Sequence, residues 1–178
     1  LDGDKLYSEK SARYYKKMGL NAVVKNISEQ NQPKVIIDLL NRYNPDVLVI
    51  TGHDRMIRKG IEFDNINNYR NSKYFIETVL KARTWRENRN DLVIFAGACQ
   101  SFFEAIMEAG ANFASSPGRI LIDFMDPLVV AEKIANTENY KYVTINDIIP
   151  EIRDGYKGVG GTGAIGKKKT MNKTNWQE

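Results

Sequence analysis

The sequence predicts an α/β domain with a mostly parallel sheet and helices on both of its faces. Helical and strand patterns alternate along the 178 residues, and this alternation is typical of layered α/β proteins. Two strand patterns, 46–51 (DVLVIT) and 91–96 (DLVIFA), are apolar after their first residue. Continuous apolar runs of this kind are typical of strands that are covered on both faces. The length allows one domain with a sizeable core, or at most two small ones.

Several segments are predicted as helices from their amphipathic patterns and from the residues that end them. Segment 4–18 is polar and amphipathic, and it stops at Gly19. Segment 32–43 has Pro33 in its first turn, where a missing N–H costs little. The remaining predicted helices span 72–85, 100–109, 127–136 and 147–153.

Short strands are expected between these helices. Besides the two apolar runs, strand patterns occupy 21–27, 111–115, 119–124 and 141–145. Segment 52–70 is polar and rich in Asn, so we expect a long loop there. The chain opens with Leu1 and the residues LDGD. We interpret them as the end of a first strand in a piece of a longer protein.

The composition argues against several classes of protein. A net charge of +4 is mild, and the basic residues are scattered among acidic ones, so we expect no nucleic-acid partner. The chain has one Cys and therefore no internal disulfide, so nothing requires an oxidising compartment. It has no apolar run long enough to span a membrane and no signal-peptide pattern at its start. We therefore expect a cytoplasmic protein that does not enter a membrane.

The sequence holds one His and one Cys, and each follows an apolar strand and a Gly. His53 lies at the end of VLVITGHD, and Cys99 lies near the end of LVIFAGACQS. In a parallel sheet, sites form where loops leave the carboxyl ends of strands, and neighbouring strands lie about 4.8 Å apart. The two side chains are therefore predicted to meet at one edge of the sheet.

This pair of residue types fits nucleophilic catalysis. A free thiol has a pKa of about 8.5 and is mostly protonated at neutral pH, whereas the thiolate is the nucleophile. An imidazole nearby takes the proton and later returns it to a leaving group. The predicted helix that begins at Gln100 would stabilise a thiolate, and its free N–H groups would hold an oxyanion. We expect no metal or other cofactor, because one His and one Cys form no closed zinc site without two carboxylates.

Other interpretations stay open from the residues alone. A free Cys is often buried and only packs, and a single His is more often structural than catalytic. A glutamine amidotransferase-like hydrolase also places its Cys on a sharp strand-to-helix turn, but with Gly on both sides and with the His later in the chain. Here Ser101 follows the Cys and His53 precedes it. A non-catalytic flavodoxin-like binding module would use 45–54 as an ordinary ligand loop.

Several stretches together resemble one group of peptidases. A strand that ends in Gly-His and a second that ends in Ala-Cys resemble the caspase-like cysteine peptidases, which include clostripain, gingipain and legumain. Within that group, TGHD, NNYRNSKYF, LVIFAGACQS, MEAGANFASSP and YKGVGGTG are similar to the YabG family of sporulation-specific proteases. The resemblance runs over nearly the whole chain, from LDGD to GVGGTG.

The resemblance implies a three-layer caspase-like fold and a cysteine endopeptidase that cleaves spore coat and cortex proteins after Arg. His53 falls on the family's catalytic His, and Cys99 falls on its nucleophile. The wider group usually has Gly after the His, and the N–H of that Gly helps to hold the oxyanion. Asp54 stands in this place here, so its N–H becomes the expected contact with the substrate. The resemblance also implies a location at the spore coat in the sporulating cell, and self-cleavage at an Arg is compatible with it.

Cleavage after Arg requires a carboxylate that pairs with the guanidinium, preferably through both oxygens. The segment after the predicted nucleophile helix offers Asp123 and Asp126, with Ser115 and Ser116 nearby. We favour Asp126, since it lies at the end of a predicted strand. Asp126 before Pro127 is equally an ordinary helix N-cap.

Residues 156–178 are expected to form a tail rich in Gly and Lys, after a peptidase domain at 1–155. Segment 161–168 (GTGAIGKK) nearly fits a phosphate-binding loop. However, Lys168 stands where a Ser or Thr would bind magnesium, and no apolar strand precedes the segment. A flexible segment is the better interpretation of these residues.

Overall fold

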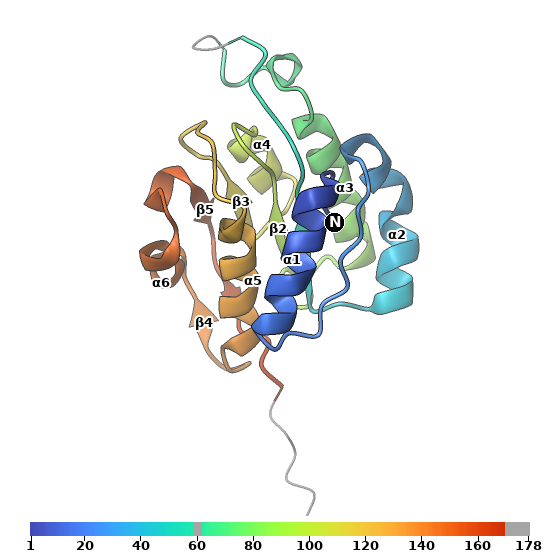
Figure 1. Ribbon diagram of the computed structural model, residues 1–178, viewed down its shortest axis with the longest axis vertical. Helices are drawn as coiled ribbons and strands as arrows, with labels where there is room; N and C mark the ends of the chain where they lie inside the picture. Colours follow the sequence, from blue (N-terminus) through green and yellow to red (C-terminus); the bar gives the residue numbers. More distant parts are fainter. Residues whose placement is uncertain (59–61, 170–178) are drawn as a thin grey trace, which may run out of the picture.

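A central sheet of four strands forms the middle layer of the protein. The computed structural model describes residues 1–58 and 62–169, and the strands lie in the order β1-β2-β3-β5. Their bounds are Val47–Ile50 for β1, Val93–Ala96 for β2, Phe113–Ser115 for β3 and Val159–Gly161 for β5. β1, β2 and β3 are parallel, and β5 is antiparallel to β3. The predicted mostly parallel α/β sheet is therefore confirmed (Figure 1).

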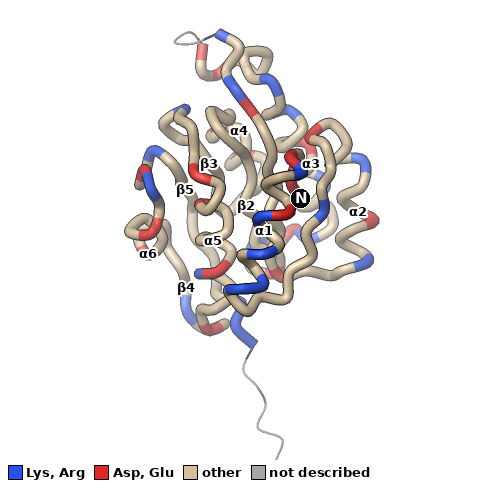
Figure 2. The backbone as a smooth tube through the Cα atoms, viewed as in Figure 1, with Lys and Arg blue, Asp and Glu red and all other residues tan. Residues whose placement is uncertain are grey.

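Helices cover both faces of this sheet. One face packs against α2 (Gln32–Tyr43), α3 (Ser72–Trp85) and α4 (Phe103–Glu108). The other face packs against α1 (Lys5–Lys17), α5 (Met125–Asn136) and α6 (Ile145–Ile148). Figure 1 shows α1 and α5 side by side in front of the sheet. In the view of Figure 2, basic and acidic positions are interspersed along these elements.

The core follows from the alternation of side chains along each strand. Leu48 and Ile50 of β1 pack toward α2 and α3, whereas Val47 and Val49 pack toward α1 and α5. Successive side chains of a strand point to opposite faces, so an uninterrupted apolar run fills both layers at once. Phe95 of β2 is almost fully buried, and burying such a side chain stabilises the fold by about 1.5–3 kcal/mol.

The opening residues extend the sheet beyond β1. Asp2 bridges Thr51 on one side and Asn26 on the other, both in parallel. The Thr51 N–H donates to the Leu1 carbonyl at 2.9 Å, and the Gly3 N–H donates to the Thr51 carbonyl at 3.2 Å. The expected first strand is thus present as a short extended segment. The predicted strand at 21–27 is wrong, because only Asn26 pairs with a neighbour.

Some predicted bounds are shifted by local hydrogen bonds. The predicted strand at 119–124 is irregular, and α5 begins at Met125, two residues before its predicted start. The predicted helix at 147–153 is instead α6 followed by a 3-10 turn. It starts early because Thr144 and Asp147 form a capping box, in which each side chain accepts a hydrogen bond from the backbone N–H of the other residue.

Much of the expected C-terminal tail is built into the domain. β5 lies beside β3, and β6 (Ala164–Ile165) pairs with β4 (Tyr142–Val143) in a second, two-stranded sheet. A flexible segment at 161–168 is therefore wrong. A side-chain carbon at Gly160 would lie 2.6 Å from the Phe103 ring, so this Gly permits close packing rather than motion. Residues 170–178 of the expected tail lie outside the described residues.

The lengths of the helices bear on the expectation that the protein does not enter a membrane. No helix within residues 1–58 and 62–169 combines the length and the apolar composition needed to cross a membrane.

Candidate active site

The strand register brings the ends of β1 and β2 together. Ile50 pairs with Ala96 in the parallel register, and the Gly97 N–H donates to the Ile50 carbonyl at 2.9 Å. His53 follows Ile50 by three residues, and Cys99 follows Ala96 by three. The His and the Cys therefore leave adjacent strands at the same carboxyl edge and at the same distance along the chain.

A buried carboxylate ties the two loops to each other. Asp54 Oδ1 accepts hydrogen bonds from the N–H groups of Arg55 at 2.8 Å and Asn71 at 2.7 Å. Its Oδ2 accepts from the hydroxyls of Ser72 at 2.5 Å and Ser101 at 3.1 Å. Ser72 opens α3, and Ser101 follows the Cys, so one carboxylate joins the His53 loop, α3 and the Cys99 loop.

Asp54 can contact a substrate only through its backbone, because its carboxylate is buried. Asp54 is buried, with 7% of the residue exposed, and its carboxylate points into this network. Burial raises the pKa of the Asp54 carboxyl, although the hydrogen bonds it accepts act in the opposite direction. A contact with substrate is left to its backbone N–H.

The Cys99 loop is a tight turn that is held from several sides. The Ala98 N–H donates to Ser101 Oγ at 2.8 Å. Gln100 has a left-handed backbone with φ of 55°, and its N–H donates to the Ile120 carbonyl at 2.9 Å. The thiol of Cys99 is half-buried and lies 4.0 Å from the Ile122 carbonyl oxygen. A non-Gly residue with positive φ is uncommon and is often found at functional sites.

The predicted helix start at Gln100 is wrong. α4 begins at Phe103, because the left-handed Gln100 cannot continue a right-handed helix. Two N–H groups at this turn, those of Ala98 and Gln100, are already used by Ser101, Ser116 and Ile120. The direct stabilisation of a thiolate by a helix N-terminus is therefore not available to Cys99.

Ser115 and Ser116 support the Cys99 loop from inside the protein. Both residues are fully buried. Ser115 Oγ donates to the Ala98 carbonyl at 3.2 Å. Ser116 Oγ donates to the Ile120 carbonyl at 2.8 Å and accepts from the Gln100 N–H at 3.1 Å. These hydroxyls shape the turn around the Cys, and their burial keeps them away from an incoming substrate.

The imidazole of His53 is exposed, whereas its backbone is fixed. Its side chain is 60% exposed, and Nε2 lies 2.8 Å from Asp4 Oδ2. The His53 N–H donates to Glu29 Oε1 at 2.7 Å, and the His53 carbonyl accepts from Asn71 Nδ2 at 2.7 Å. The Tyr7 ring meets the imidazole edge-on at 6.3 Å between centroids.

Asp4 and Glu29 also belong to this site, although neither was predicted from the sequence as a site residue. Glu29 lies over two glycines: a side-chain carbon at Gly3 or Gly52 would come within 2.3 Å of its carboxylate. Asp4 follows the extended opening segment as His53 follows β1. The rule that placed the His and the Cys at strand ends thus also pointed to the Asp of LDGD.

Asp123 and Asp126 lie together beyond the Cys99 loop. Asp123 is one-third exposed, and its Oδ2 is 3.5 Å from Arg153 Nη1. Arg153 Nη2 also donates to the Leu121 carbonyl at 2.6 Å. Asp126 is buried in the first turn of α5, and burial raises the pKa of its carboxyl to about 6. Its N-cap alternative is wrong, because Phe124 holds the cap position.

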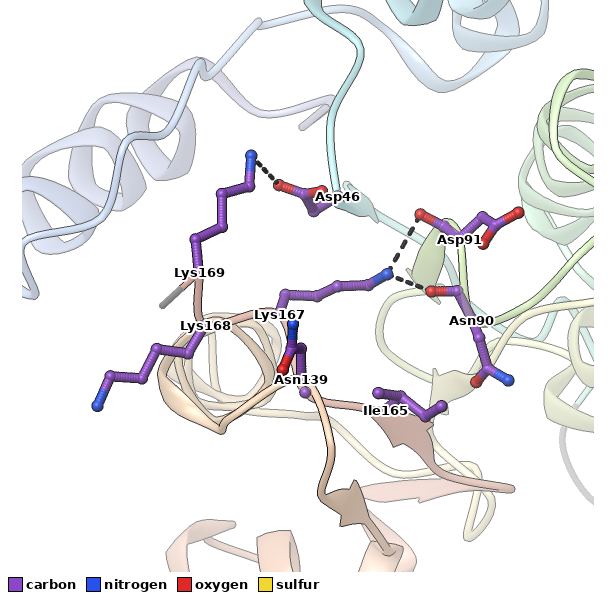
Figure 3. Close-up of a pocket in the computed structure, with 9 residues that line it drawn as sticks. Asp46, Asn90, Asp91, Asn139, Ile165, Lys167, Lys168 and Lys169 are labelled. Carbon is purple, nitrogen blue, oxygen red and sulfur yellow. Dashed lines mark hydrogen bonds and ion pairs between the residues drawn. The ribbon is translucent and has the colours of Figure 1, made fainter. Parts of the chain in front are cut away.

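A surface cavity lies elsewhere. It has a volume of about 350 Å³ and is lined at the amino ends of β1 and β2 by Asp46, Asn90 and Asp91, together with Lys167, Lys168 and Lys169 (Figure 3). The chemistry-bearing His and Cys are at the opposite edge of the sheet. Within residues 1–58 and 62–169, no group of three or more His, Cys, Asp or Glu side chains could hold a metal ion.

The fold and the two loops define a class: an α/β protein with the residue types of a thiol hydrolase at the carboxyl edge of its sheet. A family model described as YabG peptidase U57 matches residues 1–172, so the chain belongs to this peptidase family. It is 42% identical over 161 residues to the sporulation-specific protease YabG of Bacillus subtilis (strain 168). That match covers 90% of this chain and 56% of the relative, so the chain spans about half the length of that relative. No solved structure matches the chain.

Proposed function

We propose that this chain is the catalytic part of a sporulation-specific cysteine endopeptidase in which His53 and Cys99 form a dyad. The observation that carries the proposal is the register: the only His and the only Cys of the chain lie three residues beyond the paired residues Ile50 and Ala96. Family membership supports peptide bonds as the target. The name of the relative, a sporulation-specific protease, supports a role in sporulation. Spore coat and cortex proteins are the substrates that we propose.

The reaction starts with transfer of the Cys99 thiol proton to His53. The thiolate then attacks the carbonyl carbon of the scissile bond, and a C–S bond forms while the carbonyl oxygen becomes an oxyanion. Collapse of this intermediate breaks the C–N bond, and His53 gives its proton to the leaving amine. Water, deprotonated by His53, hydrolyses the resulting thioester and restores the thiol.

The oxyanion is held by backbone N–H groups of the two loops. In the part of the chain that the structure describes, neither Cys99 nor Asp54 uses its N–H in a hydrogen bond within the protein. The Asp54 carboxylate points inward to Ser72 and Ser101, so its negative charge is turned away from the developing oxyanion. Donors placed in advance around this oxygen stabilise the transition state more than the ground state.

Arginine selectivity comes from Asp123, with Asp126 behind it. The Ile122 carbonyl oxygen lies 4.0 Å from Cys99 Sγ. Asp123 is the next residue in the chain, so its backbone lies near the nucleophile. Arg153 shows how a guanidinium is held here: its two terminal nitrogens face the Asp123 carboxylate and the Leu121 carbonyl, while its Nε donates to Asp154 at 2.7 Å. A substrate Arg would bind the same two groups in its place. This assignment differs from the sequence preference for Asp126, which is almost inaccessible.

The dyad is tested with the sole thiol as the reporter. Iodoacetamide is expected to modify Cys99 rapidly at pH 6–7, and His53→Ala is expected to slow that reaction by at least about tenfold, because the thiolate loses its proton acceptor. Cys99→Ala should lower kcat/KM for an arginyl peptide by at least about 10³-fold. Lys169→Gln, at the opposite edge, is the control. Slow alkylation that His53→Ala does not change would favour a binding module and overturn the dyad.

The specificity site is tested by exchanging charge at two positions. Asp123→Asn should raise KM for an arginyl peptide by about tenfold or more, because an ionic hydrogen bond is lost. Arg153→Gln should lower that KM, because the substrate no longer competes with an internal guanidinium. An unchanged preference for Arg over Lys substrates in Asp123→Asn would contradict this assignment.

A further inference from the structure

The carboxyl edge of the sheet carries a third functional group in line with the other two. Asp2 pairs with Thr51, and Ile50 pairs with Ala96. Asp4 lies two residues beyond Asp2, as His53 lies two beyond Thr51. The three neighbouring segments therefore end, in register, in a carboxylate, an imidazole and a thiol.

We propose that Asp4 is a positioning residue for His53: it accepts the Nε2–H hydrogen bond and so keeps Nδ1 as the basic nitrogen that takes the proton of Cys99. The Nε2 to Oδ2 distance of 2.8 Å fits an ionic hydrogen bond. The nitrogen that bears the proton is set by the partner of the other nitrogen. A carboxylate only accepts, so Nε2 carries the proton and Nδ1 is left with a free lone pair.

The two oxygens of Asp4 have separate partners, and this fixes the carboxylate in place. Asp4 is the N-cap of α1, and Oδ1 accepts from the Tyr7 N–H at 2.9 Å. Oδ2 is thereby directed at His53. The hydrogen bond from Tyr7, followed by the one from His53, lowers the pKa of the Asp4 carboxyl. Asp4 therefore stays ionised wherever the peptidase would work.

The charged contact supports catalysis through its effect on the imidazole. When His53 takes the thiol proton, its ring becomes positive beside the Asp4 carboxylate, and the ion pair stabilises that state. The pair is partly in water, with side-chain exposures of 60% for His53 and 27% for Asp4. Solvent screening makes the effect smaller than in a buried triad. We expect a loss of about 10–100-fold in kcat rather than the roughly 10⁴-fold known for a buried aspartate in this role.

The helix cap makes the decisive variant possible. Asn caps helices as well as Asp does, so Asp4→Asn keeps α1 in place with its amide oxygen on the Tyr7 N–H. The amide NH₂ then faces Nε2 as a donor, and the imidazole must move its proton to Nδ1. Asp4→Ser also keeps a cap but removes the contact with His53. A residue with only a structural role would give the same result in both variants and in the parent.

The experiment uses the fact that the chain has one His. The ¹⁵N chemical shifts of a single imidazole report which nitrogen is protonated, without a need for assignment. We expect the Nε2–H pattern in the parent, an inverted Nδ1–H pattern in Asp4→Asn and a mixture in Asp4→Ser. Asp147→Asn, which alters the carboxylate of another helix cap, is the matched control and should keep the parent pattern.

Kinetics complete the test and separate this inference from the proposed function on which it rests. Asp4→Asn should lower kcat for an arginyl peptide by about 10–100-fold, with KM changed less than about twofold, and Asp4→Ser should lose less. A parent-like kcat or a parent-like ¹⁵N pattern in Asp4→Asn would overturn the role of Asp4. If Cys99→Ala remained active, the proposed dyad would be wrong. If Cys99→Ala were inactive and Asp4→Asn were as active as the parent, only the role of Asp4 would be contradicted.

Discussion

The two edges of the central sheet use their polar groups in opposite ways. At the carboxyl edge, the loops are tied together by the buried Asp54, while the imidazole of His53 is left exposed and the thiol of Cys99 half-exposed. At the amino edge, a surface cavity is lined by lysines whose amines already have oxygen partners. Lys169 pairs with Asp46 at 3.3 Å, and Lys168 pairs with Glu138 at 3.8 Å.

A cavity in the surface therefore does not by itself indicate a reactive site. Lys167 donates to the carbonyls of Asn90 and Asp91, so its amine also has oxygen partners (Figure 3). A reactive site needs side chains whose proton or lone pair is available, and it needs a backbone that is held in place by hydrogen bonds. His53 meets this description, since its backbone N–H and carbonyl are both bound and its ring lies at the surface.

The largest loss of stability is expected from Asp54→Ala at the carboxyl edge. Four donors at the carboxyl edge would lose their common acceptor, and buried donors without partners destabilise a protein by about 2–4 kcal/mol in such a case. Urea unfolding followed by circular dichroism measures this loss. Ser101→Ala, which removes a single donor, should lose clearly less. Equal stability of Asp54→Ala and the parent would mean that the two loops do not depend on this carboxylate.

A pH-dependent effect is expected from Asp126. Its pKa in the folded protein is about 6, above the value of about 3.9 in an unfolded chain. The folded state therefore binds the proton more tightly, and the stabilisation is complete below about pH 4 and is lost as the pH rises through about 6. Asp126→Asn should gain about 1–3 kcal/mol relative to the parent between pH 4 and pH 8.

Urea midpoints of both proteins across that pH range would measure the Asp126 effect. The difference between the two curves is the relevant quantity, because Asp4 and Asp147, whose carboxyl pKa values are lowered, act in the opposite direction in both proteins. Parallel curves would show that Asp126 titrates normally.

The smallest effect is expected at the amino edge. Lys169→Gln removes an ion pair with Asp46 in which the Lys side chain is 83% exposed, and such exposed pairs contribute little to stability. The urea midpoint and the rate of peptide cleavage should both stay within experimental error of the parent. A loss of activity in Lys169→Gln would give the amino edge a function and remove the contrast between the edges.

Local pattern was sufficient for the regular elements. The predicted helices at 32–43 and 72–85 are α2 and α3 with the same bounds, because each has one apolar face and a clear beginning and end. The apolar runs at 46–51 and 91–96 contain β1 and β2. Placing His53 and Cys99 at one sheet edge followed from these strands, since parallel neighbours end on the same side.

Pattern failed where long-range hydrogen bonds replaced local ones. Gln100 was expected to open a helix, but its N–H is taken by Ile120 and its backbone turns left-handed. β5 was missed because Val159–Gly161 contains two glycines, which normally weaken a strand. It forms here because β3 and Phe103 leave room only for glycine.

The chemistry that is present follows from the amino-acid sequence alone: one thiol, one imidazole, and an apolar strand before each of them that places both at the same end of the sheet. The contact between Asp4 and His53 and the inward direction of the Asp54 carboxylate became visible only in the folded structure. The reason is that the order of segments across a sheet is set by long-range packing and hydrogen bonding. That order brings residues 49 positions apart into contact, which no local pattern records.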